Sequence, residues 1–194
     1  MIKRSFDFVC AFFGLLLLSP VFVLLSLWVL IDSGLPVFYF QSRVGKGGVD
    51  FLLFKFRSMM RGSDQKGLLT SKNDPRITKS GKVLRKTKLD ELPQLWNVLI
   101  GDMSLVGPRP EVRKYVELYS EEQKQVLTVR PGLTDKATIE YARESEMLDG
   151  NKEPERTYVE VIMPAKLRIS LDYLKKADFI SDLGILFSTI KRIF

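Results

Sequence analysis

Apolar residues dominate the first thirty positions and then give way to shorter patterns. Residues 8–31 include 20 apolar side chains and no charged one. As one helix this segment would be about 36 Å long, enough to cross a hydrocarbon core of ~30 Å. The run is too long for a signal peptide, and no small-x-small cleavage site follows it. The pattern therefore predicts a membrane helix within residues 1–33.

Two features set this helix apart from a simple membrane span. Ser19 and Pro20 stand near its middle, where a proline removes one helical hydrogen bond and bends the axis. Basic residues flank both ends, and basic flanks prefer the cytoplasmic side of a membrane. These flanking residues are Lys3, Arg4, Arg43, Lys46, Lys55, Arg57 and Arg61. A re-entrant helix that enters and leaves by one face and a kinked spanning helix explain these features equally well.

Shorter patterns follow, and they predict an α/β domain over residues 34–194. Residues 36–41 and 51–59 have the composition of two strands. The glycine-rich residues 45–48 between them predict a turn; they could instead cradle phosphate, but no P-loop pattern is present. Together these residues predict a small β-hairpin directly after the apolar helix.

Amphipathic helices dominate the remainder of the predicted domain. Residues 61–80 are polar and loop-like, 101–110 cannot form a regular helix, and 140–155 are acidic and exposed. Helical spacing of apolar residues predicts helices over 89–99, 111–127, 165–176 and 178–193. The last helix can pack on the domain core or lie in a membrane interface.

Charge is unevenly distributed along the chain. Residues 41–114 contain 16 Lys and Arg against 7 acidic residues, whereas the whole chain has a net charge of +7. Such a basic segment indicates an anionic partner, namely phosphates, a lipid surface or nucleic acid, or else a solvated basic face. No recognised nucleic-acid fold signature accompanies it, so nucleic acid is not an expected partner.

The residue types present exclude several kinds of chemistry. The chain has no histidine, which removes Ser-His and Cys-His catalysis and any His-ligated metal site. Cys10 is the single cysteine and lies in the apolar run, so disulfide frameworks and cysteine-clustered metals are excluded as well. Any chemistry must come from carboxylates, hydroxyls and Lys or Arg, with a hard cation held by oxygen.

Asp90 and Glu91 are the most informative pair of candidate residues. Pro93 is best tolerated in the first turn of a helix, which places the pair near a helix N-terminus, where the dipole favours ionised carboxylate. Arg85 is one of four basic residues that precede the pair, and Arg109 follows it. An ionised Asp90 among cations could be a nucleophile or a metal ligand. From these residues alone, a simple helix cap is the favoured interpretation.

Four basic residues are candidates for phosphate binding. Arg109 stands between two prolines, whose fixed backbone suits bidentate phosphate recognition, although a loop ion pair is the alternative. Arg130, which precedes Pro-Gly, has the same two interpretations. Lys55 and Arg57 lie two residues apart in a predicted strand, so both side chains share one face, toward phosphate or water.

Several segments together resemble the monotopic bacterial phosphoglycosyl transferases, in their small single-domain form. The resemblance covers nearly the whole chain, including the apolar helix with its central Ser-Pro. The matching segments are LRKTKLDELPQL at 84–95, NVL at 97–99, GDMSLVGPRP at 101–110, FKFRSM at 54–59, DPRIT at 74–78 and RPGLT at 130–134.

This resemblance implies a reaction, and it favours Asp90 as a nucleophile over Asp90 as a simple helix cap. Members transfer a phosphosugar from a UDP-sugar to polyprenol phosphate and release UMP, the first membrane step of bacterial glycan assembly. The matching nucleophile is Asp90, and Glu91 is implied to help hold Mg²⁺. Arg85 and Arg109 match nucleotide- or phosphate-binding positions. Lys55, Arg57 and Arg130 are weaker substrate-binding candidates.

The resemblance also implies a location. The family helix enters and leaves the cytoplasmic leaflet of the bacterial inner membrane, so it favours the re-entrant interpretation of residues 1–33. The catalytic domain would then be cytoplasmic, with interfacial helices and both substrates at its surface. A homodimer is left open. The rival function is a non-catalytic basic adaptor on anionic lipid, which would bind liposomes in a salt-sensitive way without Mg²⁺.

Two segments depart from the family pattern. Many members continue Pro-Gly-x-Thr as Gly-x-Ala-Gln-Val-x-Gly-Arg, whereas residues 135–143 here read Asp-Lys-Ala-Thr-Ile-Glu-Tyr-Ala-Arg. The usual Gln falls at Thr138 and the usual Arg at Ala142. Many members also carry an Asp three residues before the tyrosine that matches Tyr173, and this chain has Ser170 there. Both segments bear on which sugar is transferred.

Overall fold

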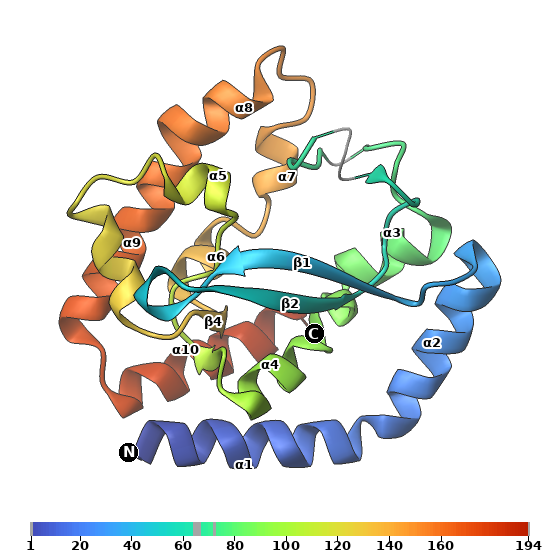
Figure 1. The fold of residues 1–194 in the computed structure, drawn as a ribbon, viewed down its shortest axis with the longest axis horizontal. Coiled ribbons are helices and arrows are strands. Elements are labelled where there is room, and N and C mark those ends of the chain that lie inside the picture. The colour runs from blue at the N-terminus through green and yellow to red at the C-terminus, as the bar shows by residue number, and fades with distance from the viewer. Residues whose placement is uncertain (1, 64–66, 72, 194) are drawn as a thin grey trace.

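The computed structural model describes residues 2–63, 67–71 and 73–193, which form a small mixed α/β domain with a helical N-terminus (Figure 1). Part of the loop expected over 61–80 therefore lies outside the described residues. The helices are α1 Ile2–Leu17, α2 Ser19–Ser33, α3 Lys79–Lys86, α4 Gln94–Ile100, α5 Arg113–Val116, α6 Lys136–Glu140, α7 Glu144–Met147, α8 Pro154–Thr157, α9 Met163–Lys176 and α10 Phe179–Ile193. The strands are β1 Phe38–Val44, β2 Asp50–Phe56, β3 Ser104–Val106 and β4 Gly132–Thr134.

The predicted break in the apolar segment is present as a bend of 61° between α1 and α2. Pro20 lies in the first turn of α2 and has no N–H to donate to the carbonyl of Leu16. Ser19 Oγ donates to that carbonyl instead, at 2.8 Å. Among the described helices, none is by itself long and apolar enough to cross a membrane, whereas the bent pair passes by length and composition.

Both ends of the bent pair are tied to the rest of the domain by polar contacts. At the start of α1, Lys3 Nζ donates to the carbonyl of Val106 in β3 at 2.9 Å. At the end of α2, Arg57 Nη2 donates to the carbonyl of Ser33 at 2.6 Å and also to that of Gly34. These carbonyls have no partner within the helix, so a buried guanidinium is well suited to satisfy them. Polar contacts to the described residues thus fix the two ends of the bent pair.

The predicted hairpin is confirmed, with shifted boundaries. β1 and β2 pair antiparallel from Phe38 opposite Phe56 to Val44 opposite Asp50. The turn between them is a single 3₁₀ turn, Lys46–Gly48, in which two glycines have φ of 70° and 76°. Positive φ is strained for residues that have a Cβ, which explains the glycine-rich composition of this turn.

A second, parallel pair of strands was not predicted from the sequence. β3 lies beside β4, with Ser104 opposite Gly132 and Val106 opposite Thr134. A Cβ on Gly132 would stand 2.1 Å from the backbone nitrogen of Gly107, so only glycine permits this approach. The pair brings the segment after β3 against the segment after β4.

The helix expected over residues 111–127 is wrong. The structure has only the four-residue helix α5 and, further on, a 3₁₀ helix Gln123–Thr128. Ser120 Oγ accepts a hydrogen bond from the Gln123 N–H, and Gln123 Oε1 accepts one from the Ser120 N–H. This reciprocal capping box starts a new helix and thereby ends the old one. The acidic stretch 140–155 is mostly exposed, as expected, and contains α7 and part of α8.

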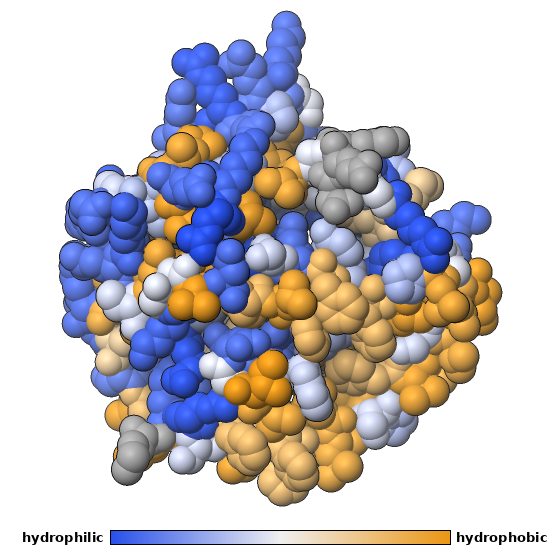
Figure 2. Space-filling model, viewed as in Figure 1, coloured by the Kyte–Doolittle hydropathy of each residue, from blue (hydrophilic) through white to orange (hydrophobic). Residues whose placement is uncertain are grey.

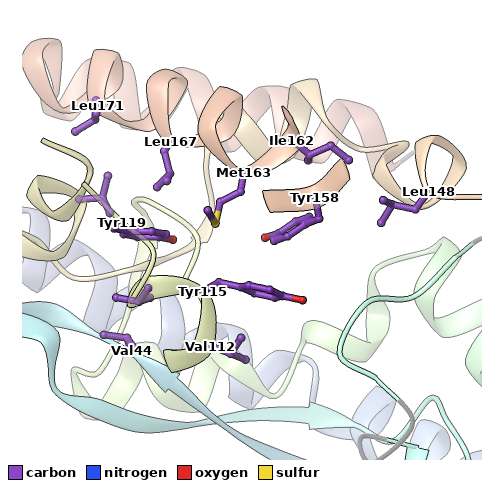
Figure 3. Packing of buried hydrophobic residues seen from close by; sticks show 12 residues of the cluster. Val44, Val112, Tyr115, Tyr119, Leu148, Tyr158, Ile162, Met163, Leu167 and Leu171 are labelled. Atoms are coloured by element: carbon purple, nitrogen blue, oxygen red, sulfur yellow. The ribbon is translucent and has the colours of Figure 1, made fainter. Parts of the chain in front are cut away.

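Buried apolar side chains form three clusters. The largest lies between α9 and the α5 region, where the rings of Tyr115 and Tyr158 are 5.0 Å apart between centroids (Figure 3). A second joins α1, α4 and β3, and α10 packs against it through Ile185 and Leu186. The third joins α2, β2 and α3 around Phe56. The clusters hold the helices around the two small sheets.

The outer faces of α1 and α2 are rich in exposed apolar side chains, which appear as the orange lower and right-hand surface in Figure 2. Helix α10 also exposes apolar side chains, so it packs on the core with one face and leaves another uncovered. The exposed residues are Phe8, Val9, Phe12, Phe13, Leu16 and Leu17 of α1, Val23, Leu24, Leu27, Trp28, Leu30 and Ile31 of α2, and Phe179, Ile180, Phe187 and Ile190 of α10.

The Phe56 cluster gives a stability prediction. Phe56 is 1% exposed and lies 5.2 Å from the ring of Phe38 and 5.5 Å from that of Phe22. Phe56→Ala should lower the free energy of unfolding by about 3–5 kcal/mol, because it removes buried contacts and leaves a cavity. Val49→Ala, at an exposed turn position, should change it by less than about 0.5 kcal/mol. Denaturant titration in detergent measures both; equal effects would contradict the packing described.

Candidate active site

Asp90 and Glu91 lie in a tight turn that leads into α4. A 3₁₀ turn over Leu89–Glu91 follows Lys88, whose φ of 59° is left-handed. Pro93 then occupies the N-cap position of α4. The pair is thus placed at a helix N-terminus, as the sequence predicted. A left-handed conformation is uncommon for a residue with a Cβ and marks a constrained reversal between α3 and this turn.

Asp90 is a buried carboxyl group with an unsatisfied oxygen. It is 5% exposed, and its Oδ1 has no hydrogen-bond partner among the described residues. Burial raises the pKa of Asp90, and the neighbouring charge of Glu91 raises it further. The cations Lys55, Arg85 and Lys88 act in the opposite direction. A simple helix cap would accept hydrogen bonds, so the unpaired oxygen favours a chemical role.

Glu91 is held between two cations from distant parts of the chain. Arg109 Nη2 donates to Glu91 Oε1 at 2.5 Å, and Arg109 Nη1 lies 3.3 Å from Oε2. Lys55 Nζ, on β2, lies 3.5 Å from Oε1. Burial alone would raise the pKa of Glu91, but Arg109 and Lys55 outweigh it and hold that pKa well below its usual range. Glu91 is therefore ionised, and it also raises the pKa of Arg109.

Lys55 titrates closer to neutrality than an ordinary lysine. Burial lowers its pKa to about 8 from 10.5; Glu91 counteracts this shift, and Arg109 adds to it. Its ammonium is charged at neutral pH, so the pair of cations around Glu91 has a surplus of positive charge there. This positive charge is already positioned to attract an anionic ligand.

The backbone around Arg109 is anchored on both sides. The carbonyl of Pro108 accepts from the Gly132 N–H at 2.9 Å, and that of Pro110 accepts from Arg43 at 3.2 Å. The Arg109 N–H donates to Asp135 Oδ2 at 3.3 Å. The prolines limit the backbone further, so the guanidinium projects from a fixed base.

The other predicted basic residues lie at different places. Arg85 lies in the last turn of α3 and is half-buried, and its guanidinium makes no hydrogen bond or ion pair with another described residue. Arg57 binds the C-terminus of α2, and its other two guanidinium nitrogens have no described partner. Arg130 is exposed and donates to the carbonyl of Gly101 at 2.7 Å, at the far end of α4 from Glu91. The structure therefore joins Lys55 and Arg109 at Glu91, and places Arg57 and Arg130 at helix ends.

Comparison with known proteins identifies the family of this chain. The model of the family described as "Bacterial sugar transferase" matches residues 1–194. The chain belongs to the bacterial sugar transferase family. The matched region contains both carboxylates and all the cations described above.

Three relatives within this family are informative. The chain is 36% identical to the UDP-N-acetylgalactosamine-undecaprenyl-phosphate N-acetylgalactosaminephosphotransferase of Aeromonas hydrophila, covering 99% of this chain and 43% of that one. It is 36% identical to the UDP-glucose:undecaprenyl-phosphate glucose-1-phosphate transferase of Escherichia coli, covering 100% of this chain and 40% of that one. It is 38% identical to the uncharacterized sugar transferase EpsL of Bacillus subtilis, covering 100% and 87%.

The chain thus spans less than half the length of the first two of these sugar transferases. The names of these two relatives join a UDP-sugar to undecaprenyl phosphate, and the sugars differ between them.

The carboxylates of this bacterial sugar transferase fit one kind of metal site. Within the described residues, no group of three or more acidic or cysteine side chains could hold a metal ion. Mg²⁺ is commonly bound by one or two carboxylates, with substrate phosphates and water completing its shell. Asp90 Oδ1 has no described partner, and Glu91 Oε2 has one, at 3.3 Å. These two oxygens fit a site of that kind rather than a cage built by the protein alone.

Two buried residues near the site were not named as site candidates from the sequence. Asp135, 2% exposed, contacts the backbone of Arg109. Gln94 is 1% exposed, follows the Asp90 turn, and has an amide nitrogen without a described partner. An aspartate directly before a helix is an N-cap signal, and the Asp135 side chain does accept from the Thr138 N–H at 2.6 Å.

The lowered pKa of Lys55 predicts how stability depends on pH. Between about pH 8 and 10.5 the folded protein has lost the Lys55 proton that the unfolded chain still binds. The contribution of Lys55 to the free energy of unfolding should therefore rise with pH across this window and be constant below it. Lys55→Met removes the titrating group.

Denaturant titrations of the wild type and Lys55→Met at several pH values measure this contribution. The difference between the two proteins should grow in favour of the wild type as pH rises. A difference that stays constant through this range would mean that Lys55 titrates normally.

Proposed function

We propose that this chain transfers a phosphosugar from a UDP-sugar to polyprenol phosphate, through a covalent intermediate on Asp90. The observation that carries the proposal is the unsatisfied, buried Asp90 beside an ionised Glu91 held by Arg109 and Lys55. Membership of the bacterial sugar transferase family supports it, as do relatives whose names specify undecaprenyl phosphate.

The reaction has two displacements at phosphorus. First, an oxygen of the Asp90 carboxylate attacks the phosphorus that bears the sugar, and the bond from that phosphorus to the bridging oxygen breaks. The bridging oxygen leaves as part of UMP. Second, a phosphate oxygen of polyprenol phosphate attacks the same phosphorus, and the bond to Asp90 breaks. This returns the carboxylate and yields polyprenol-diphosphate-sugar, so no proton donor is required.

Positive charge is the main requirement of this chemistry, because a carboxylate and a diphosphate repel each other. Arg109 and Lys55 already surround Glu91, and Arg85 is a half-buried cation without a described partner. In our proposal these side chains bind the donor phosphates, with Arg85 turning toward them. Mg²⁺ held by Glu91 would supply additional neutralisation of the developing charge. Arg57 and Arg130 have structural contacts and take no part in this step.

We further propose that α1 and α2 enter and leave the cytoplasmic leaflet of the inner membrane as one re-entrant unit. The 61° bend, the exposed apolar faces and the polar anchors at both ends support this arrangement. A polyprenol phosphate head group lies at the membrane interface, whereas a UDP-sugar is water-soluble. A domain fixed beside the leaflet meets both substrates. A non-catalytic basic adaptor would not need the buried carboxylates.

Asp90→Asn tests the nucleophile. With UDP-sugar, Mg²⁺ and undecaprenyl phosphate, UMP release should fall by roughly a thousandfold or more, because the amide cannot attack phosphorus. Asp50→Asn is the matched control: its carboxylate is exposed and pairs with Arg113 at 2.6 Å, so activity should persist. In the wild type without acceptor, a peptide containing Asp90 should gain the mass of the phosphosugar. Full activity in Asp90→Asn would refute the assignment.

The membrane topology predicts where the ends of the bent pair can be labelled. Ile2 and Leu35 are 76% and 63% exposed. In a Cys10→Ser background, a cysteine at either position should react with an impermeant maleimide from the cytoplasmic side only, in inverted inner-membrane vesicles. Right-side-out vesicles are the control. Labelling of the two positions from opposite sides would show a spanning segment instead.

A further inference from the structure

The carboxylate of Asp135 lies at the base of the Arg109 segment and has no part in the proposed phosphoryl transfer. It is 2% exposed, at the N-cap of α6, and accepts three hydrogen bonds. Its Oδ1 accepts from the Thr138 N–H at 2.6 Å. Its Oδ2 accepts from the Arg109 N–H and from Ser170 Oγ, each at 3.3 Å.

The contact between Asp135 and Arg109 involves the backbone of the Pro-Arg-Pro segment. Pro108 and Pro110 have no N–H, so the Arg109 N–H is the only backbone donor in the Pro-Arg-Pro segment. That N–H donates to the Asp135 side chain rather than to a backbone carbonyl of a strand or a helix. The negative charge of Asp135 also acts, with that of Glu91, to raise the pKa of Arg109. No described cation forms an ion pair with Asp135 itself, and the Arg109 N–H is one of the three donors that its carboxylate accepts from.

We infer that Asp135 is a positioning residue, whose carboxylate holds the Arg109 backbone so that the guanidinium reaches Glu91 and the donor phosphates. This inference rests on the proposed function, because Arg109 is assigned to the donor there. Asp135 acts only through Arg109 and touches no reacting atom.

A neighbouring residue offers a second place for the same charge. Ser170, on α9, approaches Asp135 Oδ2 from the other side and is 6% exposed. Ser170 on α9 and Asp135 at the start of α6 are therefore in hydrogen-bond contact although they lie far apart in the sequence. An aspartate at 170 would extend into the space that Asp135→Gly vacates. What the Arg109 segment requires is one negative charge at this place, and an aspartate at either position 135 or position 170 could supply it.

Two substitutions at position 135 test the inference through donor use. Asp135→Asn keeps the size and the α6 cap but turns an amide donor toward the Arg109 N–H. The kcat/KM for UDP-sugar, measured by UMP release, should fall about tenfold, mainly through KM, the effect of one charge-assisted hydrogen bond. Asp135→Gly should lose at least as much, and Asp135→Gly combined with Ser170→Asp should recover most of it.

Asp7→Asn is the matched control. Asp7 is 3% exposed and accepts the Leu105 N–H at 3.1 Å, so it is a buried aspartate on a backbone donor outside the site. Its kcat/KM should stay within about twofold of the wild type, because an amide oxygen can still accept that bond. A purely structural Asp135 would change the melting temperature but leave the KM for UDP-sugar unchanged.

The contact also has a readout that needs no activity. Hydrogen exchange of the Arg109 amide, followed by NMR, should be slow in the wild type and in Asp7→Asn, faster in Asp135→Asn, and slow again in the double variant. A wild type that releases no UMP would refute the proposed function. An active wild type with Asp135→Asn at the same KM, or a double variant no better than Asp135→Gly, would overturn the positioning role of Asp135.

Discussion

The ion pair between Glu91 and Arg109, reinforced by Lys55, is the interaction on which the site depends. It joins the turn before α4 to the segment after β3 and to β2, which are far apart in the sequence. A buried charge left without its partner is strongly destabilising. The three side chains therefore constrain one another, and the Asp90 turn has its position because Glu91 is held. Asp90 itself contributes no hydrogen bond from Oδ1 to this framework.

Apolar packing supports this framework from the side of the N-terminal helices. Leu89 and Leu92, on either side of the carboxylate pair, pack against the cluster that contains Phe56 of β2 and Leu25 of α2. The apolar segment and the candidate active site thus share one core. Arg57 strengthens the same junction, because it satisfies the carbonyls at the end of α2. The candidate site is thereby packed against the same core as the apolar helices, as the proposed reaction between a soluble donor and a lipid acceptor requires.

Elements dominated by local physics could be predicted well. The Ser-Pro break, the glycine-rich turn of the hairpin, the start of α4 near Pro93 and the two C-terminal helices all depend on neighbours in sequence. Residues 111–127 were predicted wrongly because their apolar spacing conceals the capping contacts between Ser120 and Gln123. The β3–β4 pair was missed because two strands of three residues leave too short a pattern, and their pairing depends on the close approach of Gly107 and Gly132.

By itself, the sequence determined the kinds of chemistry available. With no histidine and with one cysteine in the apolar run, carboxylates, hydroxyls and cations remained, and the motif around Asp90 indicated the family. Only the tertiary structure decided which cations contact Glu91. Five basic residues were candidates, with Arg85 and Arg109 favoured by the resemblance. In the structure Lys55 and Arg109 meet Glu91, while Arg57 and Arg130 bind carbonyls at helix ends. The same holds for Asp135. The sequence gives the charge of each side chain. Its partner depends on which distant segments the packing of the core brings within hydrogen-bond distance.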